Sequence, residues 1–115
     1  MKKFLLLLHE DIELSKKLSP REMEELVQEH IKWAAKLEES GHLISGEGLE
    51  PSSIILKGKD RTIQDGPYLE TKEIIGGFYL LEAESVEKVI EIAKECPNNT
   101  WGGTTEIRPI AEYDK

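Results

Sequence analysis

An uninterrupted run of aliphatic and aromatic side chains at residues 4–8 is the feature that most constrains the fold of this chain. A run of this length, bounded by charged residues and without polar alternation, is typical of a strand that is buried on both faces. It is far too short to span a bilayer, and no small-residue cleavage site follows it. We therefore expect a central β-strand over residues 3–9, whose carboxyl end delivers His9, Glu10 and Asp11 to a loop.

A long helix follows, and capping residues mark its boundaries. Ser19 can cap the helix, Pro20 suits the first helical position, and Glu22 can return the capping hydrogen bond. Gly41 suits the left-handed conformation just past the end. The apolar positions between these boundaries keep helical spacing: Met23, Leu26, Val27, Ile31, Trp33, Ala34 and Leu37. We expect this apolar stripe to pack on the sheet.

The remaining elements complete an α+β domain. They are a strand at 43–49, a hairpin with arms at 53–57 and 61–64, a strand at 74–83, a helix capped by Ser85 and ended by Pro97, and a strand at 104–110. This order lacks the strict strand and helix alternation of a doubly wound parallel sheet. We therefore predict a ferredoxin-like split βαβ sandwich with an extra β-hairpin, as a single domain over residues 1–115.

The charge balance argues against a nucleic acid or a membrane surface as a partner. The formal net charge is −8, from 23 acidic and 15 basic side chains, and the sequence shows no segregated basic patch. Such a chain repels phosphate backbones and anionic lipids. Cys96 is the only cysteine, so it cannot form an intramolecular disulfide, which suits a reducing compartment. We expect a cytoplasmic protein.

His30 is the most informative ionisable residue, because helical spacing places it within the apolar stripe and should point it toward the sheet. One interpretation is a half-buried histidine satisfied by a single hydrogen bond. The other is a general acid or base, tuned by apolar surroundings and a carboxylate partner. Asp65 is the natural candidate for that partner, since Gly66 and Pro67 shape a rigid turn beside it. An ordinary turn aspartate that bonds nearby backbone amides is the alternative.

Further polar residues are candidates for ligand contact. Glu47 lies between glycines that would let a ligand approach closely, although a β-bulge or a strand-end charge explains it equally well. Lys72, just before the strand at 74–83, could bind a polar ligand or simply be solvated. The histidines and carboxylates show no known metal-ligand spacing, and Gly76-Gly77 is not the glycine pattern of a nucleotide loop. We expect neither a metal nor another cofactor.

The segment DGPYLETKE at residues 65–73, followed by GGFYLL at 76–81, resembles the hallmark of the DGPF group within the YCII-related family. The resemblance extends to the opening strand, to His30, and to the GEGL and EIRP sequences. Tyr68 departs from the hallmark, because the family name implies phenylalanine at this position. The resemblance implies a ferredoxin-like fold that pairs into a homodimer of the dimeric α+β barrel kind.

The resemblance also carries an expectation about chemistry. Members of the wider family are similar to muconolactone-isomerase-like proteins, and a histidine and aspartate pair has been proposed as their active site. On this sequence the resemblance implies His30 as the histidine, with Asp65 as the aspartate. DGPF-type proteins also look like frequent genomic companions of extracytoplasmic-function sigma factors, which implies a regulatory or stress-linked role.

We therefore expect a homodimeric small-molecule enzyme of the lyase, isomerase or hydrolase type. His30 would act as acid or base, and Asp65 would orient it or hold the substrate. Glu47, Lys72 and Tyr68 would line the cleft, and the chemistry would need no cofactor. The alternative is a non-catalytic small-ligand-binding or regulatory module linked to sigma-factor signalling. A third option is that His30 and Asp65 only stabilise the dimer.

Overall fold

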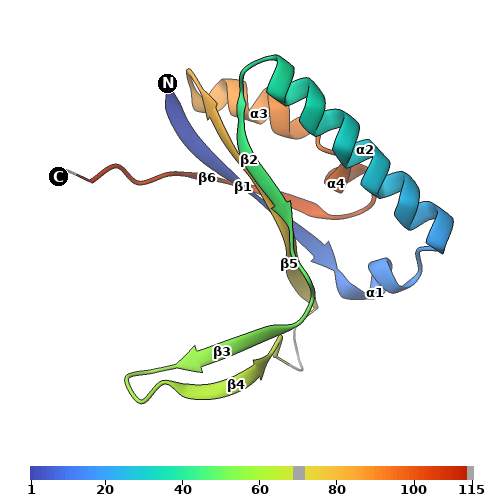
Figure 1. Ribbon diagram of the computed structural model, residues 1–115, viewed down its shortest axis with the longest axis vertical. Coiled ribbons are helices and arrows are strands. Elements are labelled where there is room, and N and C mark those ends of the chain that lie inside the picture. The colour runs from blue at the N-terminus through green and yellow to red at the C-terminus, as the bar shows by residue number, and fades with distance from the viewer. Residues whose placement is uncertain (69–71, 114–115) are drawn as a thin grey trace.

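The computed structural model describes residues 1–68 and 72–113, and a four-stranded antiparallel sheet forms its centre. The strands are β1 (Lys2–Asp11), β2 (Leu43–Gly48), β5 (Glu73–Ala83) and β6 (Thr104–Pro109), in the order β2-β5-β1-β6 (Figure 1). β1 is central, because it pairs with β5 on one side and with β6 on the other. This strand order, with one long helix after β1 and another after β5, is ferredoxin-like, so the predicted fold class is confirmed.

The long helices α2 (Pro20–Glu39) and α3 (Val86–Lys94) pack on the same face of this sheet (Figure 1). α2 begins as the sequence predicts: the Ser19 hydroxyl accepts from the Glu22 N–H, and the Glu22 carboxylate accepts from the Ser19 N–H. Gly41, past its end, has a φ of 83°. No helix in the described part of the chain is both long and apolar enough to cross a membrane.

Short helices add to this framework. β1 continues through His9, Glu10 and Asp11, which we expected in a loop. α1 (Ile12–Lys16) follows directly, because the Asp11 carboxylate accepts hydrogen bonds from the N–H groups of Glu13 and Leu14. α4 (Pro97–Thr100) begins at the proline that we expected only to end the preceding helix. Cys96, just before it, is buried, and burial raises the pKa of its thiol.

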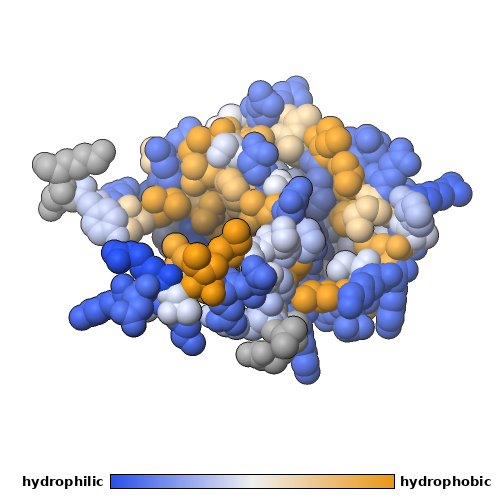
Figure 2. Space-filling view, turned by 60° about the horizontal axis from the view of Figure 1, so that its bottom comes forward, coloured by the Kyte–Doolittle hydropathy of each residue, from blue (hydrophilic) through white to orange (hydrophobic). Residues whose placement is uncertain are grey.

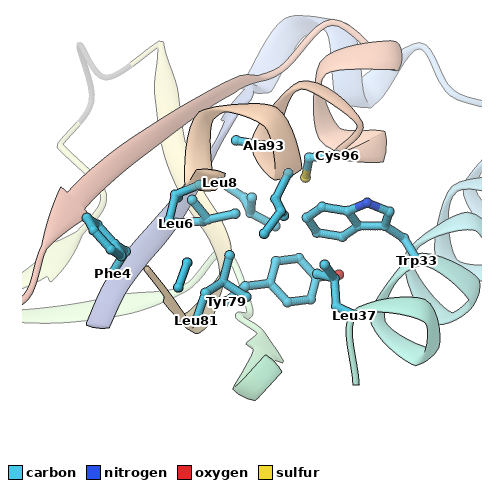
Figure 3. Packing of buried hydrophobic residues seen from close by; sticks show 12 residues of the cluster. Phe4, Leu6, Leu8, Trp33, Leu37, Tyr79, Leu81, Ala93 and Cys96 are labelled. Atoms are coloured by element: carbon cyan, nitrogen blue, oxygen red, sulfur yellow. The ribbon is translucent and has the colours of Figure 1, made fainter. Parts of the chain in front are cut away.

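The core lies between the sheet and the long helices (Figure 3). On β1, the side chains of Phe4, Leu6 and Leu8 face the helices and are buried. Leu5 and Leu7 point to the opposite face and stay half-exposed. The expectation that this strand is buried on both faces is therefore wrong for the single chain. The helices cover one face only, and the molecule is just 18 Å thick along its shortest axis.

The apolar stripe of α2 packs on the sheet along only part of its length. Trp33 and Leu37, in the C-terminal half, are buried in the core. Met23, Val27 and Ile31 remain 41%, 47% and 55% exposed. The expectation that the whole stripe packs on the sheet is wrong here, because residues 23–34 of α2 lie over a cavity.

A separate hairpin consists of β3 (Ser53–Lys57) and β4 (Thr62–Gly66). The predicted hairpin is present and projects away from the helices (Figure 1). Its second arm runs two residues further than predicted, so Asp65, which we expected in a rigid turn, lies on the strand. Ile54 pairs with Asp65, and Leu56 pairs with Ile63, so these side chains share one face of the hairpin. The apolar members Ile54, Leu56 and Ile63 are 74%, 60% and 71% exposed. Figure 2, in which the hairpin comes forward, shows hydrophobic side chains in the open on this side of the molecule.

Candidate functional site

A cavity of about 390 Å³ lies between residues 23–34 of α2 and the sheet, next to α1. The apolar part of its wall includes Leu14, Leu18, Met23, Leu26, Val27 and Ile31. The polar residues that line it are Glu10, Asp11, Ser15, His30, Glu47, Tyr79, Asn98 and Trp101. A mainly apolar concave surface with a few polar groups is the usual form of a small-molecule site.

His30 of α2 and Tyr79 of β5 meet at the wall of this cavity. The His30 Nδ1 lies 2.7 Å from the Tyr79 hydroxyl oxygen, and the two rings are stacked with centroids 5.9 Å apart. Trp33 packs edge-on against the Tyr79 ring, with centroids 5.1 Å apart (Figure 3). The packing of Trp33 therefore holds Tyr79, and Tyr79 orients His30. The expectation that His30 points toward the sheet is confirmed by this contact.

Burial keeps both groups of the pair uncharged at neutral pH. Burial lowers the pKa of His30 below its ordinary value of 6.5, and the Glu29 carboxylate opposes part of that change. Burial, with a smaller effect from Cys96, raises the pKa of Tyr79 to about 12. The hydrogen bond consequently joins a neutral imidazole to a protonated phenol.

The direction of this hydrogen bond sets which nitrogen of the imidazole carries the proton. The phenol can donate to Nδ1, or it can accept from an Nδ1–H. If it accepted, the Tyr79 proton would lack an acceptor among the described residues, since His30 is its hydrogen-bond partner there. We infer that Tyr79 donates, which satisfies both groups and leaves the imidazole proton on Nε2. That nitrogen is then available to donate to a ligand.

Gly46 on β2 makes room for the Tyr79 ring. A Cβ at position 46 would lie 2.7 Å from Cδ1 of Tyr79, well inside contact distance. A Cβ at Gly48, by contrast, would meet nothing within 4 Å. The first glycine of this strand thus serves the placement of Tyr79. Glu47, between the two, lines the cavity, but it pairs with Phe78, so its exposed side chain points to the face of the sheet opposite Tyr79.

Glu10 lies on the sheet side of the same cavity. Because side chains alternate along a strand, Glu10 lies on the same face of β1 as Leu8 and faces the helices. His9 lies on the opposite face, where its Nε2 is 2.8 Å from the Glu106 carboxylate. A β-bulge in β5 makes room for the Glu10 carboxylate. Leu8 pairs with Gly77 and the next residue, His9, pairs with Ile75, so Gly76 is an extra residue without a partner on β1. A Cβ at position 76 would collide with the Glu10 carboxylate.

Several polar groups of the wall are already engaged within the chain. Trp101 Nε1–H donates to the Glu29 carboxylate at 2.8 Å, which ties the segment after α4 to α2. The Asn98 amide donates to the Thr104 carbonyl at 3.0 Å. Glu10 makes no hydrogen bond or ion pair with any described residue. Burial alone raises the pKa of its carboxyl above the ordinary value of 4.5.

The structure brings together some of the residues singled out from the sequence. His30 and Glu47 share the cavity, whereas Lys72 and Tyr68 are not among its described lining residues. Lys72 is exposed just before β5, where its carbonyl accepts from the Ile12 N–H at 2.9 Å. Tyr68 lies beside a separate surface pocket next to the hairpin. Their role as ligand contacts stays a prediction.

Asp65 lies apart from His30 within the single chain. It is exposed on β4, on the apolar face of the hairpin, and does not line the cavity that His30 lines. Figure 1 shows the hairpin and α2 at separate places in the fold. The predicted His30 and Asp65 pair therefore depends on a second chain and stays a prediction.

Sequence reasoning missed Tyr79 and Glu10, although signals for both were present. Tyr79 alternates with Gly77 and Leu81 on a strand, which places its ring on the buried face, where a hydroxyl needs a partner. Glu10 is spaced two positions after Leu8, so the alternation of side chains along β1 places it on the same buried face. A glycine within a strand, such as Gly76, often marks a bulge or a close approach.

The chain is a small α+β protein with a candidate ligand site. It has a ferredoxin-like sheet, one layer of helices, and a mainly apolar cavity under the first long helix. A family model described as the YCII-related domain matches residues 3–114, and the chain belongs to this family. The predicted family is thus confirmed, while the finer DGPF grouping stays a prediction.

A relative with a partial match carries no functional description. An uncharacterised protein of Rhizobium meliloti (strain 1021) is 40% identical to this chain over 52 residues. The match covers 44% of this chain and 42% of that protein, so it spans less than half of the relative's length. The similarity therefore supports the relationship without assigning an activity.

Proposed function

We propose that this protein is a small-molecule enzyme of the isomerase, lyase or hydrolase type, in which His30 acts on an oxygen atom of the substrate. The observation that carries the proposal is the hydrogen bond between His30 and Tyr79 at the wall of the cavity. Because Tyr79 occupies Nδ1, the ring presents one defined proton, on Nε2, to the occupant of the cavity.

A fixed N–H group of this kind suits reactions in which a carbonyl oxygen gains negative charge. It can donate a hydrogen bond that strengthens as the charge develops, and it needs no reorganisation to do so. Loss of one such donor typically lowers kcat by about 100- to 1,000-fold. The neutral state of His30 supports this role over that of a permanently charged anchor.

Isomerisation of a simple lactone tests the proposal. α-Angelica lactone, an uncharged β,γ-unsaturated lactone, would be incubated with the protein in D₂O, and deuterium uptake and double-bond migration would be followed by proton NMR. In this reaction the Glu10 carboxylate, which also lines the cavity, would take the proton from the α-carbon and return a solvent-exchanged one to the γ-carbon, while His30 donates to the carbonyl oxygen. We expect the wild-type protein to accelerate both, and His30→Gln to lose about 100-fold or more of that rate. Glu13→Gln, on the exposed surface of α1, is the matched control.

Equal rates for the wild type and His30→Gln would contradict the catalytic role. They would favour the alternative function, a non-catalytic ligand-binding or regulatory module linked to sigma-factor signalling. That alternative predicts that a ligand occupies the cavity and is recovered unchanged, with His30→Gln weakening affinity only.

We also propose that two copies of the chain associate through the apolar face of the hairpin. Ile54, Leu56 and Ile63 form an exposed apolar surface there, which proteins usually cover with a partner. The half-exposed Leu5 and Leu7 add apolar surface on the open face of the sheet. Family resemblance supports a second copy as that partner.

Asp65 would enter such an interface, because it shares the hairpin face with these apolar residues. Sedimentation velocity tests the association. We expect a wild-type dimer and a monomer for the double variant Ile54→Ser with Ile63→Ser, while Ile90→Ser on α3 stays dimeric. A wild-type monomer at all concentrations would contradict the proposed dimer. It would also exclude a contact between Asp65 of one copy and His30 of the other.

A further inference from the structure

The charges around the cavity restrict what can bind in it. Among the described residues that line it, none is a lysine or an arginine, whereas Glu10 and Asp11 bring carboxylates and the Glu47 side chain points to the opposite face of the sheet. The Asp11 carboxylate is engaged by N–H groups of α1. Glu10 is therefore the carboxylate that a ligand inside the cavity would meet.

The strand pairing fixes the position of Glu10. It sits on the central strand rather than on a loop, and a bulge at Gly76 opens the space that its carboxylate fills. A side chain at position 76 would displace the carboxylate. Sheet geometry and glycine together hold this group at the cavity wall.

A carboxylate held in this way lacks compensation within the described chain. A partly desolvated charge without a hydrogen-bond donor is unfavourable, and the raised pKa of Glu10 reflects that cost. A ligand that brings a donor or a positive charge removes the penalty. A second negative charge would add repulsion to it, in a molecule whose net charge is already −8.

We propose that Glu10 anchors the ligand of this cavity, and that this ligand is an uncharged or cationic molecule with a mainly apolar body. Its hydroxyl or amine group faces Glu10, and an oxygen acceptor faces Nε2 of His30. Carboxylates and phosphates are rejected. The inference rests on the proposed function, because it requires that a small molecule occupies the cavity.

A matched set of probes on one ring tests the inference. Benzylamine, benzyl alcohol and benzoate differ in charge and share an apolar body. Each would be titrated into ¹⁵N-labelled protein, and amide shifts around His30 and Glu10 would give the dissociation constants. We expect benzylamine to bind at least about tenfold more tightly than benzoate, with benzyl alcohol between them.

Substitutions assign this preference to Glu10. Glu10→Gln should lose most of the benzylamine preference, by about tenfold, while Glu13→Gln removes the same charge from the nearby surface and should leave it intact. Gly76→Ala, which displaces the carboxylate, should resemble Glu10→Gln. If Glu10→Gln failed to fold, circular dichroism would show it, and Gly76→Ala would replace it.

The outcomes separate this inference from the proposed function. Benzoate binding as tightly as benzylamine, or an unchanged preference in Glu10→Gln, would overturn the role of Glu10 and leave the cavity as a ligand site. Absence of any shift around His30 with all three probes would overturn the cavity as a ligand site, and both proposals with it.

Discussion

The Nδ1 of His30 lies 2.7 Å from the hydroxyl of Tyr79, and this contact links α2 to the sheet at the wall of the cavity. It connects the packing of the core to the chemistry of the candidate site, because Trp33 holds the Tyr79 ring and Tyr79 orients the imidazole. Disturbing any part of this chain of contacts should change both stability and ligand binding.

Tyr79→Phe removes the hydroxyl and keeps the ring. We expect the free energy of unfolding to fall by about 1 kcal/mol, the usual contribution of one hydrogen bond. Urea unfolding at neutral pH measures the change. Tyr113→Phe, at a side chain that is 83% exposed, serves as the control and should be silent. A Tyr79→Phe protein as stable as the wild type would show that the hydrogen bond contributes nothing.

Gly46→Ala should destabilise the protein by about 1–3 kcal/mol, because the new methyl group would press on Tyr79 in a well-packed region. Gly48→Ala on the same strand meets open space and should change stability far less. Thermal unfolding of the two variants provides the comparison. Equal effects would mean that Gly46 does not serve the placement of Tyr79.

His30 should make stability depend on pH in the mildly acidic range. Its folded pKa lies below 6.5, so the unfolded state takes up a proton first as the pH falls. The stabilising contribution is present above 6.5 and is lost as the pH falls through the folded pKa. Urea unfolding at about pH 7 and about pH 5 should show a smaller loss for His30→Gln than for the wild type. Equal losses would contradict the burial of a neutral imidazole.

Glu10 should have the opposite dependence. Its folded pKa lies above 4.5, so its contribution is fully present below 4.5 and is lost as the pH rises through the folded value. At neutral pH, Glu10→Gln should therefore be at least as stable as the wild type, and the difference should close in acid. A Glu10→Gln protein that is clearly less stable at neutral pH would indicate a favourable partner for the carboxylate.

Local rules predicted most of the fold. The capping box at Ser19, the Gly41 terminus and the hairpin appear as expected, since each depends on residues close in sequence. Burial of β1 and α2 was overestimated, because periodicity identifies an apolar face without showing what covers it. The helices cover only one face of the sheet, and only part of α2 packs against it. No local sequence pattern contains that information.

The candidate site was predicted in part for the same reason. His30 was identified from its place on an apolar helix face. Its partner was not, since the contact with Tyr79 spans 49 positions in sequence and depends on strand register. Asp65 was chosen for its turn and its family resemblance, and the single chain places it on the hairpin. The position of the Glu10 carboxylate at the cavity depends on the bulge at Gly76, and this bulge is defined only by the pairing of β1 with β5.

The protonation state of His30 tests the account most directly. Long-range ¹H–¹⁵N NMR of the imidazole at neutral pH, in the wild type and in Tyr79→Phe, reports both its charge and the nitrogen that carries the proton. We predict a neutral ring protonated on Nε2 in the wild type, and loss of that single tautomer in Tyr79→Phe. A charged ring, a proton on Nδ1, or identical spectra for the two proteins would contradict it.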